Sequence, residues 1–212
     1  MTVRARSLSL KGLDVFYPIV PDFAWLERLV PLGIKTIQLR LKEASPQRVR
    51  REIAASLEVC VRHDCQLIVN DYWQEALALG ADYIHLGQED LAGADVAAIH
   101  AKGARLGIST HSEDELTTAL AADPAYVALG PIYETRLKVM KWAPQGLDRL
   151  ADWKRRIRGL PLVAIGGITP GRADGVMAAG ADSVAVITDF FTHPDPPARV
   201  RQWLAWAERV RA

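Results

Sequence analysis

The chain of 212 residues has few of the features that identify metal-clip, secreted or membrane proteins. It contains two cysteines, Cys60 and Cys65, which flank His63 without a second pair of ligands, so a zinc site is not indicated and reduced cysteines are expected. The first eleven residues carry basic side chains but no apolar block, and no later apolar run approaches the length of a membrane span. These absences argue against a signal peptide and predict a cytoplasmic protein.

Neither positive nor negative charge is in clear excess. The formal net charge is +1 and no long basic run appears, so neither nucleic acid nor an anionic membrane is expected as the main partner. Small molecules are the expected ligands, and homo-oligomerisation is left open. Half of the residues are apolar, which at this length supplies one substantial core and indicates one domain.

Short apolar runs alternate with segments of helical periodicity from residue 14 onward. The runs predict strands at residues 15–20, 36–40, 66–70, 83–86, 105–109, 126–129, 162–165 and 183–187. Caps and glycines predict helices at residues 23–30, 46–64, 72–79, 95–101, 113–121, 147–156 and 172–179, followed by a final helix. We expect an α/β fold, a single-domain (β/α)8 TIM barrel at residues 13–212, with residues 1–12 as an N-terminal extension whose flexibility is left open. A doubly wound open sheet is the alternative.

Gln38, Arg40 and Lys42 alternate with leucines at the end of the second predicted strand. On an edge strand they would form a solvated face. At the carboxyl end of a barrel strand, where active sites of this fold lie, they would instead converge on an anion, since arginine and lysine suit phosphate oxygens. The barrel position favours the anion site.

Carboxylates follow two neighbouring predicted strands. Asn70 and Asp71 end the third, and Asp90 lies on the loop expected after the fourth, through Gly93. Asn70 or Asp71 could simply cap the next helix, and Asp90 could be an ordinary loop carboxylate. Beside the cations of the second strand, however, the two aspartates predict a Mg²⁺ and diphosphate site. His85, within its strand, is expected to be a core or supporting histidine.

A second anion site is predicted at the last two strands. Gly166 and Gly167 follow the seventh strand, and Ile187 and Thr188 end the eighth, where barrels bind phosphate through backbone N–H groups. A plain turn is the alternative for the glycine pair. The long loop at residues 130–145 is expected to be functional or mobile. Two anion sites predict two phosphorylated substrates.

Several segments, in this order and spacing, resemble the thiamine phosphate synthase family from Tyr17 to Thr188. They are residues 38–42, 70–73, 85–90, 107–111, 130–133 with Thr135 and Lys138, 143–147 and 164–168. The resemblance implies condensation of 4-amino-2-methyl-5-hydroxymethylpyrimidine diphosphate with 4-methyl-5-hydroxyethylthiazole phosphate, with release of diphosphate. It also implies that a pyrimidine carbocation forms and is captured by the thiazole nitrogen.

The resemblance further implies a role for each matching residue. The pyrimidine diphosphate would be held by Gln38, Arg40, Lys42, Asn70, Ser109 and Lys138. Among these, the expected catalytic residues are Arg40, Lys42, Ser109 and Lys138. The thiazole phosphate would be held by Thr135, Gly167, Ile187 and Thr188. Asp71 and Asp90 would bind Mg²⁺, the implied cofactor.

Two segments depart from the family pattern. Glu134 stands where a proline is common and Leu137 where a threonine is common, which removes a hydroxyl expected near the thiazole phosphate; Arg136 is a candidate to compensate. Asp189 places a carboxylate close to the same site. The diphosphate half of the assignment therefore follows the family more closely than the thiazole half.

Two other functions remain open. A related thiazole tautomerase would bind thiazole phosphate and use a histidine for proton transfer, a part that His111 could play. Such an isomerase would not require the cations and carboxylates named above. A catalytically silent phosphate-binding regulator is the third hypothesis, and it would bind ligand without Mg²⁺-dependent turnover.

Overall fold

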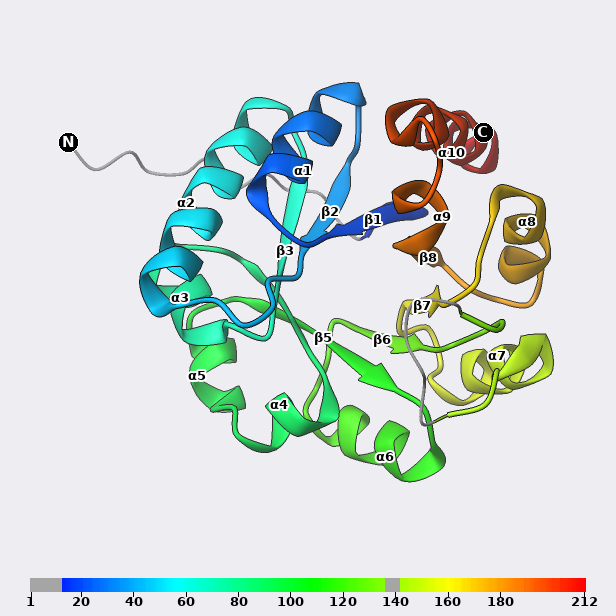
Figure 1. Cartoon of the computed structure of the whole chain (residues 1–212). Helices are drawn as coiled ribbons and strands as arrows, with labels where there is room; N and C mark the ends of the chain where they lie inside the picture. The colour runs from blue at the N-terminus through cyan, green and yellow to red at the C-terminus, as the bar shows by residue number, and fades with distance from the viewer. Residues whose placement is uncertain (1–12, 136–141) are drawn as a thin grey trace.

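Eight parallel strands form a closed barrel in the computed structural model, which describes residues 13–135 and 142–212 (Figure 1). Each strand pairs with the next, and β8 closes the barrel against β1. The strands are β1 Phe16–Val20, β2 Thr36–Leu39, β3 Gln66–Asn70, β4 Tyr83–Leu86, β5 Arg105–Thr110, β6 Tyr126–Leu129, β7 Leu162–Ile165 and β8 Ser183–Val186. The expected single-domain (β/α)8 barrel is confirmed, and the open-sheet alternative is wrong. The prediction for residues 1–12 lies outside the described residues.

Helices surround the barrel (Figure 1). They are α1 Phe23–Leu29, the short 3₁₀ helix η1 Val30–Leu32, α2 Pro46–Arg62, α3 Trp73–Ala78, α4 Gln88–Ala92, α5 Val96–Ala101, α6 Glu113–Ala121, α7 Gly146–Arg156, α8 Pro170–Ala178, α9 Thr188–Phe191 and α10 Pro196–Arg211. Three helices have side-chain caps: Asp22, Ser45 and Ser112 each accept a backbone N–H in the first turn of the following helix.

Side chains of the strands alternate between the barrel interior and the helices. The interior cluster contains Tyr17, Ile19, Ile68, Tyr83, Tyr126, Ala128, Val163 and Ala185. Asn70 and His85 each come two residues after a member of this cluster, and Gln38 pairs in register with Ile19 and Ile68. These three polar residues therefore face the interior, above its apolar layer.

Two short helices were not expected, α4 and α9. The sequence predicts a loop from the end of the fourth strand, at Leu86, through Gly93, and this prediction is wrong because α4 lies there. Gly87 adopts an extended N-cap conformation, and Glu89 and Asp90 place negative charge in the first turn, where the helix dipole favours it. At the eighth strand, pairing ends at Val186, and Thr188 starts α9 instead of ending the strand.

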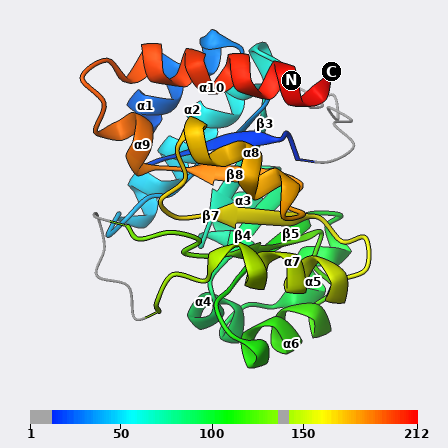
Figure 2. The ribbon, with the colours of Figure 1, turned by 90° about the vertical axis from the view of Figure 1, so that its right-hand side faces the viewer.

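Helix α10 packs beside β1, the first strand of the barrel. It contacts β1, η1, α8 and α9, and Figure 2 shows it along one side of the barrel. The Trp203 ring stacks on Phe16 of β1, with ring centroids 5.1 Å apart. Arg211 Nε donates to Asp14 Oδ1 at 2.8 Å, just before β1. Within residues 13–135 and 142–212, no helix combines the length and apolarity that crossing a membrane requires.

Candidate functional site

The residues expected to hold the pyrimidine diphosphate lie at the carboxyl ends of neighbouring strands. Gln38 lies in β2 and Asn70 ends β3, and both are buried, while Ser109 lies near the end of β5. Arg40 follows β2 and is half-buried, and its backbone N–H donates to Val20 O at 2.8 Å. Because β2 pairs on both sides within a closed barrel, the solvated edge-strand alternative is wrong. Lys138 lies outside the described residues.

Asp71 and Asp90 form a carboxylate pair beside this cluster. Burial and the neighbouring Asp90 raise the pKa of Asp71 to about 6, although the charges of Lys42 and Arg40 oppose the rise. Lys42 Nζ lies 4.0 Å from Asp71 Oδ2. The helix-capping alternative for Asn70 and Asp71 is wrong: the N-cap of α3 is Tyr72, which makes no side-chain capping bond, and Asp71 has a left-handed backbone with φ of 67°.

The carboxylate pair fits a divalent cation that is completed by substrate. Two carboxylates close enough to raise a pKa repel each other, and a cation between them would relieve that repulsion. Among the described residues, no group of three or more His, Cys, Asp and Glu side chains could hold a metal ion. Mg²⁺ commonly takes one or two carboxylates and draws its remaining oxygens from phosphate and water, so the donor set suits that ion.

His85 links the interior of the barrel to Ser109. Its Nε2 lies 2.8 Å from Ser109 Oγ, and its Nδ1 lies 2.7 Å from the Tyr126 hydroxyl. Burial, together with the charge of Arg40, lowers the pKa of His85 to about 3, so the ring is neutral. His85 is thus a buried supporting residue, as its position in a strand predicts. Tyr126 is missed by sequence reasoning, which places it only as a strand residue.

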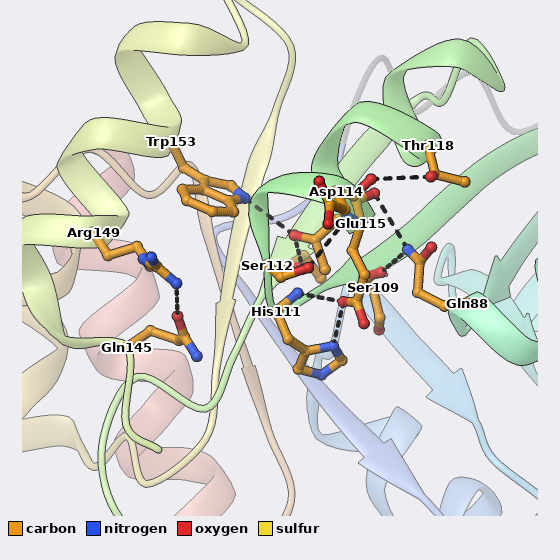
Figure 3. Close-up of polar contacts among 12 residues, drawn as sticks. Gln88, Ser109, His111, Ser112, Asp114, Glu115, Thr118, Gln145, Arg149 and Trp153 are labelled. Carbon is orange, nitrogen blue, oxygen red and sulfur yellow. Dashed lines mark hydrogen bonds and ion pairs between the residues drawn. The ribbon is translucent and has the colours of Figure 1, made fainter. Parts of the chain in front are cut away.

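A polar cluster surrounds the end of β5 (Figure 3). The Glu115 carboxylate accepts from the His111 backbone N–H at 2.6 Å and lies 2.8 Å from His111 Nδ1. Gln88 Nε2 donates to the Ser109 carbonyl at 2.7 Å. The His111 ring also stacks on Trp142, with centroids 5.9 Å apart and planes 6° from parallel. His111 is therefore held in place by its neighbours at the mouth of the barrel.

The loops after β6 and β7 interlock around the glycine pair. Gly166 and Gly167 have φ values of 99° and 65°. A Cβ on Gly166 would lie 2.6 Å from Pro131 Cα, and one on Gly167 would lie 2.5 Å from Glu134 O. Tyr133 N donates to Gly166 O at 3.0 Å, between the same two loops. Only glycine combines this backbone with this closeness, so the packing of the two segments requires glycine at both positions.

Asp189, the carboxylate near the expected thiazole phosphate site, accepts hydrogen bonds on both of its oxygens. Arg199 Nε and Nη2 donate to its two oxygens at 2.8 and 2.7 Å, and Trp203 Nε1 donates at 2.8 Å. Its charge is thus paired with α10. Ile187 directly precedes α9 and Thr188 begins it. Thr135 is half-buried and Glu134 is exposed, while Arg136 and Leu137 lie outside the described residues.

Comparisons with known proteins agree on one family. The family model described as thiamine monophosphate synthase matches residues 17–190. Curated proteins named thiamine-phosphate synthase include one from Rhizobium etli, 59% identical over 91% of this chain and 95% of its own length. One from Neisseria gonorrhoeae is 45% identical over 92% and 96%. A solved thiamine phosphate pyrophosphorylase from Pyrococcus furiosus shares the fold, with a TM-score of 0.81 and 24% identity, over 93% of this chain and 96% of that one.

Proposed function

The chain belongs to the thiamine monophosphate synthase family and is a thiamine-phosphate synthase, a transferase, and from this premise we propose how its residues carry out the reaction. The reaction condenses 4-amino-2-methyl-5-hydroxymethylpyrimidine diphosphate with 4-methyl-5-hydroxyethylthiazole phosphate and releases diphosphate. The observation that carries the proposal is the carboxylate pair Asp71 and Asp90 beside Arg40 and Lys42 at the barrel mouth. Cations and paired carboxylates in one place suit a leaving group that gains negative charge.

The substitution is dissociative in this proposal. The bond between the pyrimidine methylene carbon and the diphosphate oxygen breaks first, and its electron pair leaves with the diphosphate. Arg40, Lys42 and Lys138 stabilise the departing charge, while Gln38, Asn70 and Ser109 hold the substrate. The thiazole nitrogen then donates its lone pair to the carbocation and forms the new carbon–nitrogen bond. Because the leaving group is stabilised electrostatically, no activated protein nucleophile is required.

Asp71 and Asp90 would hold Mg²⁺ in this site. When bound, the ion supplies additional positive charge to the diphosphate oxygens. The elevated pKa of Asp71 supports this role, because a carboxylate pair of this kind gains stability from a nearby cation.

The thiazole phosphate is assigned to the loops after β6 and β7 and to the start of α9. Thr135, Gly167, Ile187 and Thr188 would contact it, and the lack of a side chain at Gly167 would let backbone N–H groups approach a phosphate. Pairing of Asp189 with Arg199 supports the assignment, because it neutralises the nearby carboxylate. We also propose a cytoplasmic location and small molecules as the partners. Whether the chain forms homo-oligomers is left to measurement.

Turnover by the purified full chain tests the function. Both substrates with Mg²⁺ should give thiamine phosphate and diphosphate, detected by chromatography, and chelation should abolish the products. Asp71→Asn should lower turnover strongly, because it removes an expected ligand of the ion. Glu89→Gln, an exposed carboxylate beside Asp90 on α4, is the matched control and should retain turnover.

Other outcomes identify the rival functions. Isomerisation of thiazole phosphate without condensation would support the tautomerase, in which His111 moves the proton. Tight binding of either phosphate compound without any Mg²⁺-dependent product would support the regulator. A folded chain that forms no thiamine phosphate would contradict the synthase.

A further inference from the structure

His85, Gly107 and Tyr126 lie in one row of the barrel, and His85 connects Tyr126 to Ser109. His85 of β4 pairs in register with Gly107 of β5, which pairs with Tyr126 of β6. The Tyr126 side chain passes over the middle strand and reaches His85 Nδ1 at 2.7 Å. The opposite ring nitrogen, Nε2, lies 2.8 Å from Ser109 Oγ. A continuous hydrogen-bonded path therefore runs from Tyr126 through His85 to Ser109.

The path depends on the absence of a side chain at position 107. A Cβ on Gly107 would lie 2.1 Å from Cε1 and Cζ of the Tyr126 ring and 2.5 Å from its hydroxyl oxygen. Real Cβ atoms do not approach this closely, and the Tyr126 ring is itself fully buried between strands and cannot move aside freely. Glycine at this row thus allows the tyrosine to cross a strand and meet the histidine.

The chemistry of the three groups fixes the direction of the path. A neutral imidazole has one donor nitrogen and one acceptor nitrogen. The phosphate oxygens and ring nitrogens of the pyrimidine diphosphate accept hydrogen bonds, so Ser109 serves that substrate when its hydroxyl donates. Its oxygen is then free to accept from His85 Nε2–H. Nδ1 must in that case be the acceptor, and it receives its hydrogen bond from the Tyr126 hydroxyl.

We propose that Tyr126, acting through His85, is a positioning residue that holds the Ser109 hydroxyl as a hydrogen-bond donor to the pyrimidine diphosphate. The inference rests on the proposed function, which places Ser109 against that substrate. Burial raises the pKa of the Tyr126 hydroxyl, so this group keeps the proton that it donates to His85. Gln38 Nε2 is buried and makes no hydrogen bond within the described residues.

The tautomer of His85 tests the proposal without any turnover. Nuclear magnetic resonance of the full chain with ¹⁵N-labelled histidine should show His85 protonated at Nε2 at neutral pH. The signal is identified by its loss in His85→Gln or, should that variant not fold, by single replacement of each of the other four histidines. In Tyr126→Phe the Nε2–H form should lose its dominance. A native ring protonated at Nδ1 would overturn the proposal.

A double-mutant cycle tests the effect on the reaction. Tyr126→Phe should lower kcat/KM about tenfold, the scale of one hydrogen bond, in wild type but cause little further loss in Ser109→Ala. A residue that only stabilises the barrel would instead give additive losses, which would overturn the proposal. Tyr83→Phe is the control, since its ring packs on Tyr126 but its hydroxyl is outside the path. Absence of turnover in wild type would contradict the proposed function, and the tautomer would then decide the inference alone.

Discussion

Arg40 acts on two titratable groups at the mouth of the barrel. Burial raises the pKa of Asp71 and lowers that of His85, and the positive charge of Arg40 lowers both. The same guanidinium therefore favours an ionised carboxylate, which can bind a cation, and a neutral imidazole, which can both donate and accept. Arg40 thus contributes to two protonation states that the proposed mechanism requires, although burial is the larger cause at both groups.

Removing that guanidinium should impair turnover more than folding. Arg40→Ala is expected to lower turnover by roughly two orders of magnitude or more, the scale seen when one charge-stabilising group is lost. Lys138→Ala should have an effect of similar size. Steady-state kinetics with both substrates measures the loss, and Arg62→Ala, an exposed arginine at the end of α2, is the control. Near-normal turnover in both variants would remove these residues from the mechanism.

At the scale of elements, apolar periodicity and capping residues predict the strands and the longer helices. The bounds of β3, β4, β6, β7 and α6 match the expected ones, because these segments combine a clear pattern with strong turn signals. The short helices α4 and α9 escape prediction because four or five residues contain too little periodicity. Their stability comes from buried contacts such as Phe190, which the sequence does not reveal.

The candidate site likewise has one part that the sequence predicts and another that it does not. Polar residues at strand ends are visible in the sequence, so the gathering of Gln38, Arg40, Asn70 and Ser109 is predictable once a barrel is expected. The left-handed conformation of Asp71 and the contact of Tyr126 with His85 are not predictable. Both depend on register and backbone geometry, which only the assembled barrel determines.

Helix α10 holds its neighbours through two similar clusters of aspartate, arginine and tryptophan. Asp189 of α9 is bound by Arg199 and Trp203, and Asp174 of α8 is bound by Arg209 and Trp206. The clusters differ in burial: the Asp189 side chain is 9% exposed and that of Asp174 is 68% exposed. Since water screens exposed charges, the two should contribute unequally to stability.

Asp189→Ala is therefore expected to destabilise the chain more than Asp174→Ala. The first substitution leaves a partly buried guanidinium and a buried indole N–H without their acceptor. This loss should lower the free energy of unfolding by about 2 kcal/mol. The second should cost less, although it removes the same kinds of bond. Urea unfolding of both variants measures the difference. Equal losses would show that burial does not govern these clusters.

For the whole molecule, the buried His85 makes stability depend on pH. Its folded pKa of about 3 lies below the ordinary value of 6.5, so between these values the unfolded chain binds a proton that the folded chain does not. Stability from this group is full above about pH 6.5 and falls as the pH falls. Asp71 acts in the opposite sense between its ordinary value of 3.8 and about 6, because its folded form binds the proton more readily.

Replacing the histidine should remove its share of the acid sensitivity. Between pH 7 and pH 5, the free energy of unfolding of wild type should fall by about 2 kcal/mol more than that of His85→Gln. This figure follows because pH 5 lies roughly 1.5 pH units below the ordinary pKa of histidine. Urea unfolding at both pH values gives the two changes. His63→Gln, at an exposed histidine, is the control and should follow wild type. Parallel curves for wild type and His85→Gln would contradict the prediction.

The missing side chain at Gly107 also constrains the order in which this barrel can change its sequence. A larger residue there collides with the Tyr126 ring, so it becomes tolerable only after Tyr126 has been replaced by something smaller. Once the tyrosine is lost, position 107 is free to vary, and any later gain of bulk there blocks the return of the aromatic ring. The order of substitutions at positions 107 and 126 therefore matters, because the first substitution decides which later ones the barrel can accept.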